Sequence, residues 1–64
     1  MKIEEGKKYR VIANPASNGV VTVHHVENQE VWYTYDAGRT DSIGYRQEYV
    51  LHIDAFRRDF ELLP

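Results

Sequence analysis

The strongest structural signal in the chain lies at residues 20–35, which read VVTVHHVENQEVWYTY. Residues 20–26 are rich in β-branched side chains and too short for a helix, so they predict a strand. Residues 31–35 combine aromatic and β-branched side chains and predict a second strand. The polar residues 27–30 between them predict a turn. The two strands should therefore pair as an antiparallel hairpin.

Two further strands are predicted on either side of this hairpin. Residues 8–13 and 45–51 alternate between apolar and polar side chains, as expected of half-buried strands. The faces that we expect to turn inward carry Tyr9, Val11 and Ala13 in the first strand and Tyr45, Tyr49 and Leu51 in the second. Residues 14–19 and 36–44 are rich in glycine, asparagine, aspartate and serine and predict loops.

The hydrophobic period changes near the end of the chain. Ile53, Phe56, Phe60 and Leu63 recur at spacings of three and four residues, which predicts a short amphipathic helix. His52 or Asp54 would begin this helix, and the Asp54 carboxylate would favour the positive end of its dipole.

These elements predict a mainly β domain that spans residues 1–64. We expect a small, partly open antiparallel barrel of four to five strands, of the SH3-like kind, with a short C-terminal helix whose Phe56 and Phe60 plug its open end. A curled four-stranded sheet with the helix packed across one end is the alternative.

Composition narrows the classes of function. The chain has 64 residues, no cysteine and a net charge of −2. The absence of cysteine favours a reducing cytoplasm, and no apolar stretch reaches the length of a signal peptide or a membrane span. A dedicated nucleic-acid-binding protein usually has a clear basic excess, which is missing here.

No constellation of residues predicts catalysis, a cofactor or a metal. The glycines do not have the spacing of a phosphate-binding loop, and neither Ser17 nor Ser42 has a recognisable His-Asp arrangement beside it. Zinc needs three or more convergent ligands, whereas adjacent His24 and His25 should point to opposite faces of their strand. We therefore expect His24, His25 and His52 to be ordinary surface or half-buried residues.

The aromatic residues predict a binding surface. By strand alternation Trp32 and Thr34 face one way, and Val31, Tyr33 and Tyr35 face the other. One set fills the core and the other stays partly exposed, unless the helix or a partner covers it. Tryptophan, tyrosine and arginine dominate the energetics of protein interfaces. The predicted protein-binding residues are Trp32, Tyr35, Arg39 and Tyr45, where Tyr35 joins only if its strand twists as it enters the loop.

Three stretches resemble small uncharacterised proteins of tailed phages and prophages. They are KIEEGKKYRV at residues 2–11, VWYTYD at 31–36 and YVLHIDAFRRDFELLP at 49–64. The resemblance implies an SH3-like fold and a location in the bacterial cytoplasm, and it assigns no catalytic or binding residue.

Together these observations favour a non-enzymatic protein-interaction module, whose partner would be a host protein if the phage resemblance holds. One alternative is a nucleic-acid-binding small barrel that adds Lys7, Lys8, Arg10 and Arg46 to the same aromatic surface. Another is self-association through edge strands. In a third, both aromatic faces are simply packed inside the domain.

Overall fold

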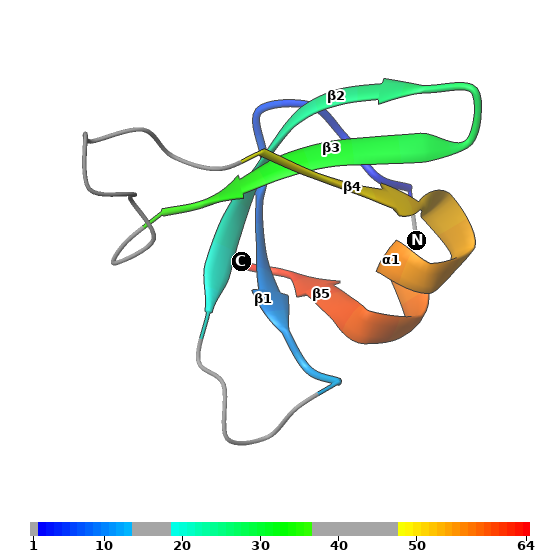
Figure 1. Ribbon diagram of the computed structural model, residues 1–64. Helices are drawn as coiled ribbons and strands as arrows, with labels where there is room; N and C mark the ends of the chain where they lie inside the picture. The colour runs from blue at the N-terminus through cyan, green and yellow to red at the C-terminus, as the bar shows by residue number, and fades with distance from the viewer. Residues whose placement is uncertain (1, 14–18, 37–47) are drawn as a thin grey trace.

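The computed structural model describes residues 2–13, 19–36 and 48–64. Within these ranges the strands are β1 (Lys8–Val11), β2 (Val20–Glu27), β3 (Glu30–Tyr35), β4 (Glu48–His52) and β5 (Phe60–Leu62), and the helix is α1 (Ile53–Asp59). The strands pair antiparallel in one sheet of order β4-β3-β2-β1-β5 (Figure 1). The chain is therefore mainly β, as the sequence predicts.

The hairpin of β2 and β3 is confirmed. Its turn consists of Asn28 and Gln29, whose φ angles are 53° and 64°, and the pair of Glu27 and Glu30 closes it. Two consecutive residues with positive φ match the twist of the flanking strands, which is why such turns connect hairpins. The Gln29 carbonyl also accepts the backbone N–H of Ile53 at 2.8 Å, so the turn is tied to the start of α1.

The sheet is curled and open between its two edge strands. β4 and β5 lie at opposite edges of the strand order, and α1 connects them along the chain. Figure 1 shows α1 at the mouth between these edges, and the helix contacts β3, β4 and β5. A partly open architecture with a helix across the gap agrees with the expected arrangement.

The predicted helix through Leu63 is wrong at its C-terminal end. α1 begins at Ile53 with His52 as its N-cap, but it ends at Asp59, and Phe60 has the extended angles φ −132° and ψ 154°. Residues 60–62 form β5 and pair with β1. Phe60 fits a helical stripe with Phe56 and Leu63, and it also fits a strand alternation with Leu62. Pairing with the free edge of β1 satisfies more backbone groups than one further helical turn would.

The first predicted strand is shorter than expected. β1 ends at Val11 because the backbone N–H groups of Ile12 and Ala13 both donate to the Asp59 carbonyl, at 2.8 and 3.2 Å. Ala13 is consequently exposed and not on the inner face. The strand predicted at 45–51 is seen as β4 from Glu48 onward. Tyr45 and most of both predicted loops lie outside the described residues.

Aromatic rings fill the space between the sheet and α1. Phe56 is fully buried and Phe60 is 5% exposed, and their rings stack at 4.3 Å between centroids. The edge of the buried Tyr9 ring meets Phe56 at 5.2 Å, and Tyr33 meets Phe56 and Phe60 at 5.4 and 5.3 Å. Edge-to-face and offset contacts of this kind are the favoured geometries for aromatic pairs. Both phenylalanines are therefore buried against the sheet as predicted, but only Phe56 comes from the helix, whereas Phe60 comes from β5.

The N-terminal segment, residues 2–7, contributes one side chain to the core and is otherwise exposed. Ile3 is 6% exposed and joins the buried cluster. The Glu4 backbone N–H donates to the hydroxyl of Tyr9 at 2.9 Å, so this buried ring has a polar partner. Gly6 then turns the chain toward β1 with φ +82°, a conformation that residues with a Cβ rarely adopt.

Candidate functional site

The two faces of β3 differ sharply in burial. Val31 and Tyr33 are buried, whereas Trp32 and Thr34, which alternate with them along the strand, are partly exposed. Burial raises the pKa of the Tyr33 hydroxyl above its ordinary value. We call the face that carries Tyr33 the inner face and the face that carries Trp32 the outer face. The buried face of the sheet, which strand alternation alone left open, is thus the one with Val31 and Tyr33.

A β-bulge in β2 places both adjacent histidines on the outer side. Val23 lies opposite Tyr33, but the next pair joins His25 to Trp32, so His24 is an extra residue. His24 and His25 are both exposed, and His24 Nε2 lies 2.6 Å from the Thr34 hydroxyl on the outer face. The prediction that they point to opposite faces is therefore wrong.

The bulge has a clear physical cause. In an unbroken strand, the period of two would direct His25 inward with Val21 and Val23 and would expose Val26. One inserted residue shifts the alternation, so that Val26 packs against the core and His25 reaches the outside. The spacing of three between Val23 and Val26, after two valines spaced by two, was the available sequence signal.

Trp32 lies on β3, between His25 on β2 and Val50 on β4. Its indole and the His25 imidazole are tilted by 51° with 5.1 Å between centroids. Val50 is its register partner on the other side and is 47% exposed. We call this group of Trp32, His25 and Val50 the Trp32 surface. An indole flanked by an exposed aliphatic residue offers the apolar centre that a protein interface needs.

A polar cluster adjoins this surface. Lys8, Thr22, His24, Thr34 and Asp36 line an open depression on the outer face. The Lys8 ammonium donates to the Thr22 hydroxyl at 2.9 Å and pairs with the Asp36 carboxylate. The Thr22 hydroxyl in turn donates to Asp36 at 2.6 Å. These groups satisfy one another, as expected of a network that joins β1 and β2 to the end of β3.

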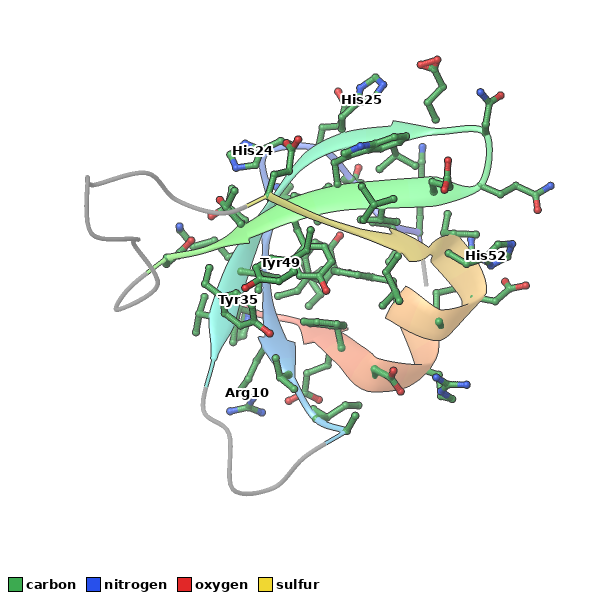
Figure 2. All side chains as sticks on the ribbon, viewed as in Figure 1. Arg10, His24, His25, Tyr35, Tyr49 and His52 are labelled. Atoms are coloured by element: carbon green, nitrogen blue, oxygen red, sulfur yellow. The ribbon has the colours of Figure 1, made fainter. Side chains whose placement is uncertain are left out.

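The predicted binding residues do not all come together. Tyr35 lies on the inner face, where its ring meets Tyr33 at 6.2 Å and Tyr49 at 5.4 Å. Figure 2 shows Tyr35 and Tyr49 inside the curl of the sheet, whereas His24 and His25 project away from it. The twist that would bring Tyr35 beside Trp32 is not present. Arg39 and Tyr45 lie outside the described residues.

Basic side chains on the outer face are accompanied by carboxylates. Lys8 pairs with Asp36, and Arg10 pairs with Glu61 across the β1–β5 ladder. These pairs are largely exposed, so each contributes little to stability. Their consequence is electrostatic, since the neighbouring carboxylate offsets the positive potential that a phosphate backbone would require.

Clusters of metal-ligating side chains and membrane-spanning helices were both sought in the part of the chain that the structure describes. No three His, Asp or Glu side chains among residues 2–13, 19–36 and 48–64 gather in a way that would hold a metal ion. Over the same ranges, no helix has the length and apolar character needed to cross a bilayer.

Sequence reasoning missed His25 and Val50 as neighbours of Trp32, and Glu5 as a neighbour of His25. The position of Val50 could have been predicted, because Val50 alternates with Tyr49 and Leu51 and so belongs on the outer face. The position of Glu5 could not have been predicted from the sequence, because it follows from the turn at Gly6. Comparisons with protein-family models, curated proteins and solved structures found no match to this chain.

Proposed function

We propose that the chain is a non-enzymatic interaction module that binds a protein partner through the Trp32 surface. The observation that carries the proposal is that the only tryptophan lies on the outer face, partly exposed, rather than in the core. The core already holds Tyr9, Tyr33, Phe56 and Phe60. Partial exposure of the indole beside Val50 is therefore not explained by a need to fill the interior, whereas an interface anchor would explain it.

The charge distribution favours a protein over a nucleic acid as partner. Single-stranded bases could stack on Trp32, but such sites combine stacking with a groove of free positive charge. Here Lys8 and Arg10 are paired with carboxylates, and Glu5 and Glu27 lie beside His25. The mechanism we propose is occupancy, in which the indole fills a pocket of the partner and blocks or recruits it.

The proposal extends to fold and origin. The strand order β4-β3-β2-β1-β5, with α1 between the last two strands, supports an SH3-like barrel. The resemblance to phage and prophage proteins makes a bacterial host protein the expected partner. Arg39 and Tyr45 stay predicted rim residues, while Tyr35 is omitted because of its inner position.

Affinity capture from bacterial lysate tests the proposal. The immobilised chain should retain a partner protein, and Trp32→Ala should abolish its retention. Ile12→Ala is the matched control, because Ile12 is a 45% exposed aliphatic residue outside the Trp32 surface. Retention by Trp32→Ala equal to that of the unmodified chain would contradict the proposal.

Two further measurements separate the alternatives. Retention through an aromatic protein interface should survive high salt, whereas binding to nucleic acid should weaken steeply. Light scattering across a range of concentrations tests self-association through the edge strands β4 and β5. A mass that rises with concentration equally in Trp32→Ala would indicate pairing of these edge strands, whereas a mass that falls back in Trp32→Ala would identify a second copy of the chain bound through the Trp32 surface.

A further inference from the structure

The N-terminal segment is attached to β2 on both sides of the bulge. The Gly6 backbone N–H donates to the Val23 carbonyl at 2.8 Å, and the Val23 N–H donates to the Lys7 carbonyl at 3.1 Å. Beyond the bulge, the Val26 N–H donates to the carboxylate of Glu5 at 3.0 Å. The first attachment uses backbone groups only, but the second depends on one charged side chain.

The same Glu5 carboxylate faces the ring of His25. Glu5 Oε2 lies 3.1 Å from His25 Nδ1, and Glu27 Oε1 lies 3.0 Å from His25 Nε2. A neutral imidazole has one N–H and one lone pair, so it can donate to only one of these two carboxylates. The other ring nitrogen would then direct its lone pair at a negative oxygen. The geometry therefore fits the doubly protonated ring, in which both nitrogens donate.

The protonated ring would also act on Trp32. With 5.1 Å between the two ring centroids, an imidazolium lies within the range in which a cation is attracted to an indole. One proton thus stabilises three contacts together, namely those of His25 with Glu5, Glu27 and Trp32.

We propose that His25 is a proton-dependent clamp, which fixes the Glu5 side chain and the Trp32 indole while its ring is charged and loosens both when the proton leaves. All contacts of the proposed clamp lie within this chain, so it needs no partner. Its role as a regulator of binding rests on the function proposed above, since it makes the rigidity of the Trp32 surface depend on pH.

The sign of the pH dependence follows from the groups around the ring. The hydrogen bond to Glu27 raises the pKa of His25 most. Burial, the next-largest effect, lowers it, but the charges of Glu27 and Glu5 and the bond to Glu5 raise it further, so that the net shift is upward. From β3 the ring faces the uncharged Trp32, and the neighbouring His24 is turned to Thr34.

A raised pKa means that protonation stabilises the folded state. The stabilisation is complete below the ordinary histidine pKa of about 6.5 and is lost as the pH rises through the higher folded value. The clamp should therefore be closed below about pH 6.5 and should open as the pH rises through the raised pKa of His25.

NMR titration of the full chain tests the clamp without any partner. The His25 ring should titrate above pH 6.5, and the Val26 amide and Trp32 indole signals should follow with the same midpoint. Glu5→Gln should lower that midpoint, although its amide oxygen can still accept the Val26 N–H. Glu4→Gln is the matched control and should leave it unchanged. In His25→Gln the Val26 and Trp32 signals should no longer titrate near neutral pH, whereas in His24→Gln they should.

The clamp is overturned if His25 titrates at or below pH 6.5, or if the Val26 amide does not follow it. Its regulatory role has a separate test with the captured partner. Affinity should fall about two- to tenfold as the pH rises past the His25 midpoint, because the partner must then immobilise the released side chains. A pH-independent affinity would refute regulation alone, whereas undiminished binding by Trp32→Ala would refute the proposed function and leave the clamp intact.

Discussion

Gln29 holds a backbone conformation that its side chain disfavours. Its φ of 64° lies in the left-handed region, which costs a residue with a Cβ roughly 1 kcal/mol or more. Asn28 before it also has positive φ, but asparagine tolerates that region better. The polarity of residues 27–30 predicted the turn, but the residue type of Gln29 did not predict its positive φ.

Replacing Gln29 with glycine should therefore stabilise the domain. We expect Gln29→Gly to raise the free energy of unfolding by about 0.5–1 kcal/mol, because Asn-Gly is the favoured pair in two-residue hairpin turns and the gain is partly offset by a more flexible unfolded chain. Urea denaturation measures the change. Gln29→Ala is the control and should give no gain. Equal stabilities of the glycine and alanine variants would show that strain at this turn is negligible.

At the scale of single elements, helix α1 depends on one side chain. The helix has seven residues, too few to be stable in isolation. Phe56 is its buried residue and contacts Tyr9, Tyr33 and Phe60. The helix is therefore held in place by packing of this ring.

Phe56→Ala should lower the free energy of unfolding by about 3–5 kcal/mol, the cost of removing a buried aromatic side chain and leaving a cavity. A 64-residue domain has little more stability than this, so we expect the variant to be largely unfolded at 37 °C. Circular dichroism during thermal and urea denaturation measures the loss. Arg57→Ala, on the exposed side of the same helix, should change stability by less than about 0.5 kcal/mol. Losses of similar size in the two variants would contradict the role given to Phe56.

Elements were predicted from the sequence where one periodicity was unambiguous. The hairpin of β2 and β3 combines strong alternation with a polar turn, so its existence and pairing were predictable. β5 was not, because Phe60 fits a helical period with Leu63 and a strand period with Leu62, and the free edge of β1 decides between them. The bulge was not predicted for a related reason. A single extra residue changes the face of every residue after it, but the composition of the strand gives no sign of it.

On the scale of the whole molecule, the sheet has a filled interior and an outer face with an aromatic centre. Which face would be buried could not be predicted from β3 alone, because Trp32 and Tyr33 are both large aromatic residues. Val21 and Val23 determine it, since they lie opposite Tyr35 and Tyr33 and are fully buried. The exposed face with Trp32 was therefore predicted only as one of two options, and Tyr35 lies on the other face. Trp32 itself stays a predicted binding residue.

The central claim is that the partner binds on the outer face at Trp32, and the single tryptophan of the chain allows a direct measurement. The protein can be labelled with 5-fluorotryptophan and followed by fluorine NMR while the captured partner is added, so that tryptophans of the partner give no signal. We predict that the resonance shifts and broadens on binding and that the fluorine becomes shielded from solvent. A bound complex in which this resonance keeps its position, width and solvent exposure would contradict the claim.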